Sequence, residues 1–222
     1  MVRRSIACSV ALLALSACGD DTPAASDAGG AGDAAADAAV VVDVVTTMPD
    51  APVVAPSAEC RVTTWREPAG NREHRDPCTE LAYPSHPPAS GPHYLVWADF
   101  LTYADPVPWG FLVHSMEHGA VVLAYNCPSG CPDVIASFES LIADHGADPS
   151  CESHPTSAAR FVVMPDPGLP EGSIAAVAWE HAYVATCLDE PSLRAFVDGH
   201  YGMAPEDLCA AGFDGSSPGW CD

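Results

Sequence analysis

The sequence contains no lysine. Its eight basic residues are all arginine, and 30 Asp and Glu residues outnumber them, so the formal net charge is −22 at pH 7. A chain this acidic is repelled by phosphate backbones, and we expect it to have no nucleic-acid partner. The shortage of cations also argues against a polybasic attachment to anionic lipid.

The sequence also lacks an apolar run of about 20 residues, the length that a membrane-spanning helix requires. Its N-terminus instead carries two arginines, a short apolar run and the ending Leu15-Ser16-Ala17-Cys18. This pattern is typical of a secretory signal peptide with a lipobox, and a cleaved signal with a free cysteine is the alternative. It resembles bacterial lipoproteins, in which residues 1–17 are removed and Cys18 carries lipid. The resemblance implies an extracytoplasmic protein, anchored by lipid to the bacterial cell envelope at the outer membrane.

Aromatic residues are absent between Gly19 and Glu59. This stretch is rich in Ala, Asp, Gly and Val and has almost no positional pattern, so we expect residues 18–59 to form a disordered tether behind the lipidated cysteine. The valines between Ala38 and Thr47 could instead pair as a strand. Asp43 and the flanking Asp-Ala repeats favour solvation.

Residues 60–222 have the length of one globular domain and contain eight of the ten cysteines. An even number of cysteines in an exported domain predicts disulfides, and four bridges leave 105 connectivities open. The short spacing of Cys127-Pro-Ser-Gly-Cys131 could also supply half of a metal site. The eight cysteines are Cys60, Cys78, Cys127, Cys131, Cys151, Cys187, Cys209 and Cys221.

The domain is expected to be α+β, with a small sheet and two main helices. Residues 60–110 contain eight prolines and should be mostly irregular, held by disulfides and packing. No internal repeat and no glycine-rich phosphate loop is visible in the sequence. The expected regular elements are a strand at 120–125, a helix at 134–145, a strand at 161–164, one or two strands at 173–187 and a helix at 191–200.

Histidines are the candidates for chemistry, and the stretch Val113-His-Ser-Met-Glu-His-Gly119 has the His-x-x-Glu-His order of a class of zinc proteases. On a helix, His114, Glu117 and His118 would share a face, whereas on a strand His114 and His118 would be about 13 Å apart. Gly119 follows at once, so the sequence supports only a short helical turn. A metal-dependent hydrolase with Glu117 as general base is therefore an alternative and not the favoured function.

A metal-binding site remains the favoured interpretation. We expect His93, which follows a rigid Pro-Gly-Pro turn, to meet His114 and His118 around one point, with Glu117 as a ligand or as the partner of one ring. Imidazole suits Zn and Cu, and the thioether of Met116 would suit Cu(I). His86 is a further candidate ligand. The alternative is that these histidines are structural hydrogen-bonding residues, and the other five are expected to be exposed or singly bonded: His74, His145, His154, His181 and His200.

Much of the domain resembles a family of bacterial proteins. The resemblance rests on Pro87-Pro-Ala-Ser-Gly-Pro-His93, on the stretch Val113–Gly119 and on Ala178-Trp179, and it covers about residues 83–207. These segments resemble the domain of unknown function 3105. Glu180 stands where we expect glycine in the family, at a tight turn. The resemblance implies no activity, so the sequence predicts a lipid-anchored extracytoplasmic protein that binds Zn or Cu. The alternative is a disulfide-stabilised interaction module without a metal, whose protein partner the sequence does not identify.

Overall fold

The computed structural model describes residues 41–46, 60–68, 70–215 and 220–221. The expected signal peptide, Cys18 and most of the expected tether lie outside these residues. None of the described helices combines the length and the apolar character needed to cross a bilayer.

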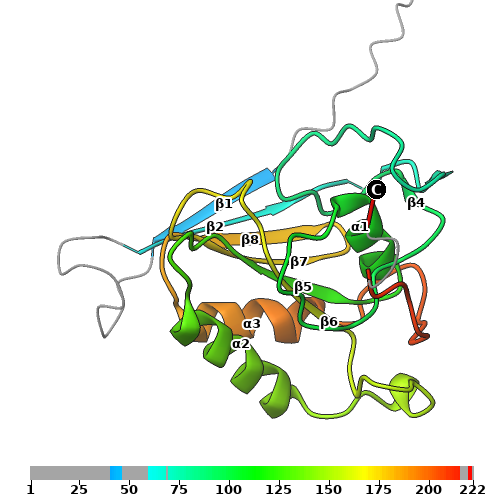
Figure 1. The fold of residues 1–222 in the computed structure, drawn as a ribbon. Coiled ribbons are helices and arrows are strands. Elements are labelled where there is room, and N and C mark those ends of the chain that lie inside the picture. The colour runs from blue at the N-terminus through cyan, green and yellow to red at the C-terminus, as the bar shows by residue number, and fades with distance from the viewer. Residues whose placement is uncertain (1–40, 47–59, 69, 216–219, 222) are drawn as a thin grey trace, which may run out of the picture. The chain divides into compact units, whose positions relative to one another are not determined.

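Six strands form a mixed sheet in the order β1-β2-β8-β7-β5-β6 (Figure 1). β5 and β6 are parallel, and the other neighbouring strands are antiparallel. The strands are β1 Val41–Thr46, β2 Arg61–Arg66, β5 Val121–Tyr125, β6 Phe161–Pro165, β7 Ile174–Ala178 and β8 His181–Ala185. A separate parallel pair joins the two-residue strands β3 His74–Arg75 and β4 His93–Tyr94.

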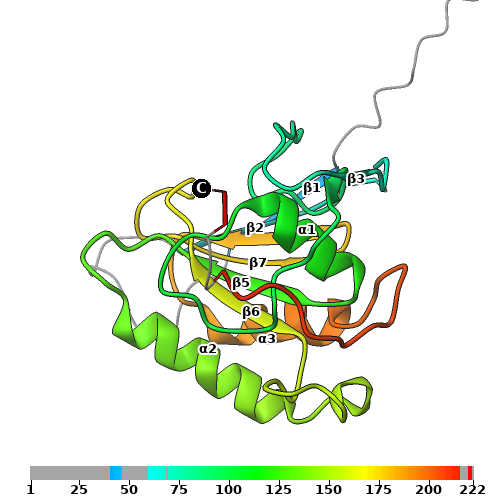
Figure 2. The same cartoon turned by 45° about the vertical axis from the view of Figure 1, so that its right-hand side comes forward.

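Helices cover both faces of the sheet. α2 Pro132–His145 and α3 Glu190–His200 lie side by side on one face, and α1 Trp109–Glu117 lies on the other with the irregular segment (Figures 1 and 2). The alternation of side chains along each strand explains this division. Val121 and Leu123 belong to the cluster that packs against α2 and α3, whereas Val122 belongs to the cluster that contains α1.

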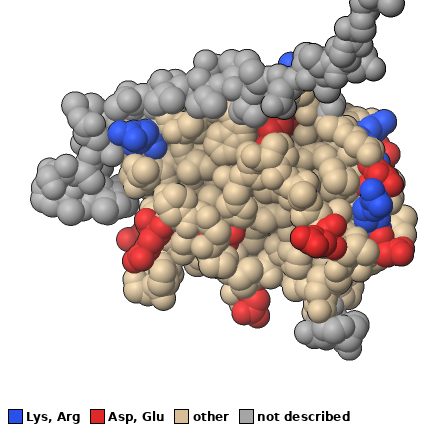
Figure 3. Space-filling model, turned by 90° about the horizontal axis from the view of Figure 1, so that it is seen from above, with Lys and Arg blue, Asp and Glu red and all other residues tan. Residues whose placement is uncertain are grey.

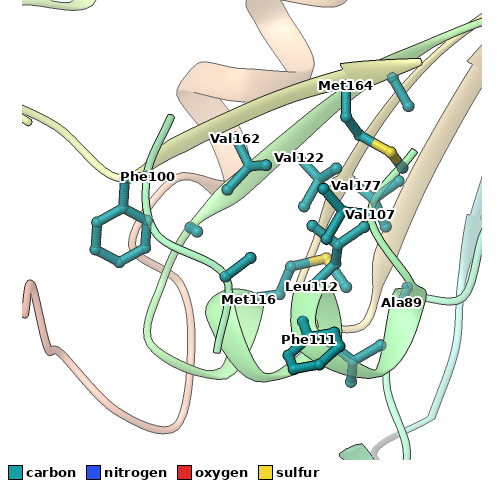
Figure 4. Close-up of a cluster of buried hydrophobic side chains, with 14 of the residues drawn as sticks. Ala89, Phe100, Val107, Phe111, Leu112, Met116, Val122, Val162, Met164 and Val177 are labelled. Carbon is teal, nitrogen blue, oxygen red and sulfur yellow. The ribbon is translucent and has the colours of Figure 1, made fainter. Parts of the chain in front are cut away.

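α1 packs closely on the sheet. Leu112 and Met116 are fully buried, and their side chains point toward Val122 and Val177 of the strands (Figure 4). Eight of the nine residues of the helix are buried. The helix therefore lies inside the domain. Its polar side chains, His114, Ser115 and Glu117, are buried with it and held in place by packing.

The α+β class is confirmed, and so is most of the expected element order. The two expected main helices are α2 and α3, and in place of the short turn expected around His114 the structure has the nine-residue helix α1. The expected irregular segment 60–110 also contains β2. The reason is that its prolines begin at Pro68, after β2 has ended.

Strand β1 departs from the tether that the composition predicts. Val41–Thr46 pairs antiparallel with β2, with Val41 opposite Arg66 and Thr46 opposite Arg61. Four of these six residues are valine, which favours extended backbone, and β2 offers an unpaired edge. Local propensity and an available strand edge account for the difference.

All eight cysteines of the domain are paired, which confirms the expected disulfides. Three bridges join segments 58 to 143 residues apart in sequence, and they are Cys60–Cys187, Cys78–Cys221 and Cys151–Cys209. The fourth, Cys127–Cys131, joins residues only four apart. The alternative use of this last pair as half of a metal site is not what the structure shows.

The irregular segment is tied to the sheet by a buried carboxylate. Glu67 follows β2 and is 2% exposed. Its Oε2 accepts hydrogen bonds from the main-chain N–H groups of Ala89 and Ser90, at 2.9 and 3.1 Å. These bonds position the turn that leads to His93.

The β7–β8 hairpin turns at Glu180, where glycine was expected. Glu180 has φ 63°, a conformation that favours glycine. Its carboxylate forms an ion pair with Arg66 at 2.6 Å, and its main-chain N–H donates to the carbonyl of Ala89 at 2.8 Å. These contacts explain how a residue with a side chain is accommodated in this turn.

Candidate metal centre

α1 supplies two residues of the candidate site. His114 and Glu117 are three residues apart, so they lie on the same side of the helix. The helix ends at Glu117, His118 is its C-terminal cap, and Gly119 with φ 93° turns the chain toward β5. The ending that the sequence predicts at Gly119 is confirmed, although the helix before it is longer than expected.

The parallel pair of β3 and β4 supplies the other two residues. His74 is the register partner of His93, and the main-chain N–H of His93 donates to the carbonyl of Glu73 at 3.1 Å. The rings of His74 and His93 lie with their centroids 4.6 Å apart. A short backbone ladder therefore places two imidazoles side by side from segments 19 residues apart in sequence.

Four side chains meet at this point: His74, His93, His114 and Glu117, which we call the His-Glu cluster. One ligand atom from each residue lies within 4.8 Å of those of the other three. The ring centroid of His114 is 4.7 Å from that of His93 and 4.9 Å from that of His74. Three of the four residues are buried, and only His74 is exposed.

Main-chain carbonyls orient two of the imidazoles. Nδ1 of His93 is 2.9 Å from the carbonyl oxygen of Gly91, and Nδ1 of His114 is 2.6 Å from that of Tyr94. A carbonyl oxygen can only accept, so Nδ1 carries the proton in both rings and Nε2 keeps its lone pair. Metal-binding histidines are oriented in the same way, by a hydrogen bond from the ring nitrogen that does not bind the metal.

Glu117 presents one oxygen to the histidines and the other to an arginine. Its Oε2 lies 3.0 Å from Nε2 of His93 and 4.0 Å from Nε2 of His74, and its Oε1 lies 3.3 Å from a guanidinium nitrogen of Arg72. The geometry between Nε2 of His93 and Oε2 of Glu117 is not that of a hydrogen bond, so both atoms are buried without a partner. Unpaired buried polar atoms are costly, and a cation between them would satisfy both.

The surroundings favour a neutral His114 and an ionised Glu117. Burial, with the neighbouring imidazoles of His118 and His93, lowers the pKa of His114 to about 4. Burial acts to raise the pKa of Glu117, but His93, His114 and Arg72 together outweigh it, and the net direction is downward. At neutral pH His114 therefore offers a lone pair and Glu117 a negative charge, as metal ligation requires.

Charged side chains gather on the side of the molecule where β4 lies. Seen from above, arginine and acidic side chains alternate along this right-hand rim, whereas most of the visible face is uncharged (Figure 3). Arg75 and Glu73, the two neighbours of His74 in the sequence, form an exposed ion pair at 2.8 Å. The exposed residue His74 of the cluster therefore has charged neighbours on both sides in the sequence.

The structure brings together three of the residues that the sequence singled out, His93, His114 and Glu117. His118 lies beside His114, with ring centroids 4.6 Å apart, but it is outside the group of four, and its Nε2 is 3.3 Å from a carboxylate oxygen of Glu206. His118 keeps the helical position next to His114, since its main-chain N–H donates to the carbonyl of His114 at 3.2 Å, but its Nε2 faces Glu206 and not the other ligands.

Two other candidate ligands lie elsewhere. Met116 is fully buried in the apolar core against the sheet. His86 is 2.9 Å from Asp166 and packs edge-on against Trp109. Both lie outside the group of four.

His74 is the residue that sequence reasoning missed. It was grouped with the scattered histidines because no motif surrounds it. Its role depends on the β3–β4 ladder, which joins it to His93 through backbone pairing of two-residue strands. Strands this short have no hydrophobic periodicity, so the sequence offers no signal for the pairing.

The cluster differs from a zinc-protease site. In that class both histidines of His-x-x-Glu-His bind the metal and the glutamate acts as base. Here Glu117 points an oxygen into the ligand group, whereas His118 stands outside it. The geometry therefore uses the motif differently from a protease.

Comparison with known proteins identifies the family. Residues 74–211, more than half of the chain, match the family described as "Protein of unknown function (DUF3105)". The chain belongs to the DUF3105 family. All four residues of the His-Glu cluster lie within this DUF3105 region, and His74 is its first residue. No curated protein and no solved structure matches the chain.

Proposed function

We propose that this DUF3105 protein is a lipid-anchored extracytoplasmic protein that binds a transition-metal ion, Zn or Cu, through the His-Glu cluster. The observation that carries the proposal is the pair of unpartnered buried atoms, Nε2 of His93 and Oε2 of Glu117, 3.0 Å apart within a group of four possible ligands. The lipobox ending at Cys18 supports the anchor. The paired cysteines of the domain suit an oxidising compartment.

The donor set suits zinc or copper better than calcium or magnesium. Three of the four ligand atoms are imidazole nitrogens and one is a carboxylate oxygen, whereas calcium and magnesium take oxygen ligands. Tetrahedral ligands about 2.0–2.1 Å from zinc are about 3.3 Å from one another. The group spans up to 4.8 Å, so binding would draw the ligands inward by rotation of exposed His74.

Exposed residues provide the route to the site. His74 has 41% of its side chain exposed and Arg72 has 50%, whereas His93 is fully buried. An ion can reach the buried ligands when these two side chains move. The bound ion would then join the β3 segment to α1.

The test is metal binding by the purified full chain. Bound metal is first removed with a chelator. Calorimetric titration of the metal-free protein with Zn²⁺ or with Cu²⁺ should then give one bound ion per chain. His74→Ala should weaken binding at least about tenfold, because it removes a ligand without disturbing the core. His86→Ala is the matched control, since His86 is 40% exposed and also lies beside a carboxylate. Equal loss in both variants, or less than one ion per chain, would overturn the metal proposal.

The anchor is tested separately. Cys18→Ser should move the protein from the membrane fraction to the soluble fraction of cells, because the lipid has no other attachment point in the lipobox. Unchanged partition would contradict lipidation without bearing on metal binding.

A further inference from the structure

The disulfide Cys127–Cys131 differs from the other three in what it connects. Its cysteines are four residues apart, whereas those of the others are 58, 127 and 143 residues apart. A bridge constrains the unfolded chain less as its loop becomes shorter. Stabilisation of the fold therefore explains the three long bridges better than it explains this one.

The position of Cys127 and Cys131 in the fold resembles that of the reactive cysteine pairs of thioredoxin-type proteins. β5, α2 and parallel β6 form a βαβ unit, and Cys127 and Cys131 lie between the end of β5 and the start of α2. Thioredoxin-type sites place a Cys-x-x-Cys pair near such a unit, and a helix N-terminus stabilises a thiolate. The spacing here has three intervening residues instead of two. Cys131 is the N-cap of the 14-residue helix α2.

The two sulfurs differ in access. Cys131 is 8% exposed, whereas Cys127 is partly exposed and is followed by the exposed residues 128–130. The turn closes with a hydrogen bond from the N–H of Gly130 to the carbonyl of Cys127 at 2.8 Å. A Cβ added at Gly130 would meet no atom within 4 Å, so there is open space at this position of the turn. A protein partner can therefore approach Cys127.

The residue before the pair is firmly fixed. The main chain of Asn126 donates to the carbonyl of Ser173 at 3.0 Å and accepts from Gly172 at 2.8 Å. Its side-chain amide donates to the carbonyl of Leu169 at 2.6 Å. The exposed turn thus projects from a rigid base, which is the arrangement that a reactive group needs.

We propose that Cys127–Cys131 is a redox-active disulfide that oxidises cysteine thiols of a partner protein. A thiolate of the partner attacks Sγ of Cys127, the bond between the two sulfurs breaks, and Cys131 leaves as a thiolate at the N-terminus of α2. A second thiolate of the partner then attacks the partner sulfur of this mixed disulfide and releases Cys127. The partner loses two electrons and gains a disulfide.

Cys127 and Cys131 gain the two electrons and take up the two protons that the partner thiols release. The reverse exchange with a small or protein disulfide restores the pair. This activity is independent of the metal site, because the His-Glu cluster lies on α1, β3 and β4 and not on this βαβ unit.

The experiment uses the full chain, a synthetic peptide with two cysteines and oxidised glutathione as terminal oxidant. The protein should accelerate formation of the peptide disulfide in proportion to its concentration, and Cys127→Ser/Cys131→Ser should lose all of this acceleration. Circular dichroism of the double variant checks that it is folded. A folded double variant that is as active as the natural chain, or a natural chain without activity, would refute the proposal.

Trapping distinguishes the two sulfurs. Cys131→Ser should form a one-to-one mixed disulfide with the oxidised peptide through Cys127, visible by intact mass. Cys127→Ser should form no such adduct at this pair, because the sulfur of Cys131 is buried. Adducts of equal yield in both variants would show that access to Cys127 does not direct the exchange, and the assignment would fail.

Discussion

A guanidinium nitrogen of Arg160 donates a hydrogen bond to the main-chain carbonyl of His118 at 2.7 Å. The same side chain forms a buried ion pair with Asp148 at 2.8 Å, and it reaches Asp207 as well. Arg160, the residue directly before β6, therefore fixes the end of α1. Arg160 thus holds the main chain at the residue that directly follows Glu117 of the His-Glu cluster.

Replacing Arg160 should destabilise the domain strongly. Arg160→Gln leaves Asp148 buried without its charge partner, and we expect the free energy of unfolding to fall by about 3–5 kcal/mol. Arg194→Gln is the control, because Arg194 and Asp144 form an exposed pair at 2.9 Å, worth about 0–1 kcal/mol. Urea unfolding measures both, and similar losses would contradict the structural role of Arg160.

Two glycines should respond in opposite ways to alanine. Gly119 has φ 93°, and an added Cβ would lie 2.6 Å from a guanidinium nitrogen of Arg160, so Gly119→Ala should destabilise the domain by about 1–3 kcal/mol. Gly199 lies in α3 with open space around it, and Gly199→Ala should stabilise by about 0.5–1 kcal/mol. Thermal melting decides, and shifts of the same sign would be evidence against these backbone assignments.

The disulfides should contribute unequally to stability. In the chain-entropy model, a bridge across 143 residues contributes about 5 kcal/mol and a bridge across four residues about 2 kcal/mol. Cys78→Ser/Cys221→Ser should therefore lower the free energy of unfolding more than Cys127→Ser/Cys131→Ser. Denaturant midpoints of the two variants test the order, and the reverse order would mean that the short bridge has a structural role.

Stability should fall below neutral pH, in part through His200. Burial and the neighbouring imidazole of His181 lower the pKa of His200 to about 4, whereas the unfolded value is about 6.5. Between these values the unfolded chain binds more protons, so the free energy of unfolding decreases as pH falls through this window.

His200→Gln is the matched variant for this effect. It should retain more of its stability than the natural chain on going from pH 6.5 to 4, measured with chelator present. His114, whose pKa is also lowered to about 4, keeps titrating in both proteins and cancels in the difference. Parallel pH curves would show that His200 does not contribute.

The sequence predicts those elements whose pattern is local. The buried runs of β5 and β6 and the apolar face of α2 follow directly from hydrophobic spacing. α1 was underestimated because Gly110 and the prolines before it were expected to precede the helix, whereas Pro108 is its N-cap and Gly110 lies inside it. β2 was missed because the prolines beyond it dominated the composition of its region.

The residues of the candidate site differ in the same way, because some follow from local sequence patterns and others do not. His114 and Glu117 were found because helical spacing is visible in sequence, and His93 because Pro and Gly fix the turn before it. His74 required a pairing between two distant segments, and His118 lies outside the group of four, where its Nε2 faces Glu206 from a distant part of the chain. Backbone pairing and side-chain contacts between distant segments are the features that local patterns do not determine.

The irregular segment also covers part of the edge strand β6. Val163, in the middle of β6, donates its N–H to the carbonyl of Leu101 at 3.0 Å, and its carbonyl accepts from Tyr103 at 2.8 Å. Open strand edges invite strand addition from other chains and hence aggregation. With Leu101–Tyr103 laid along its centre, β6 cannot recruit a strand from a second copy there, so a segment without regular structure helps to keep neighbouring molecules from polymerising through their sheets.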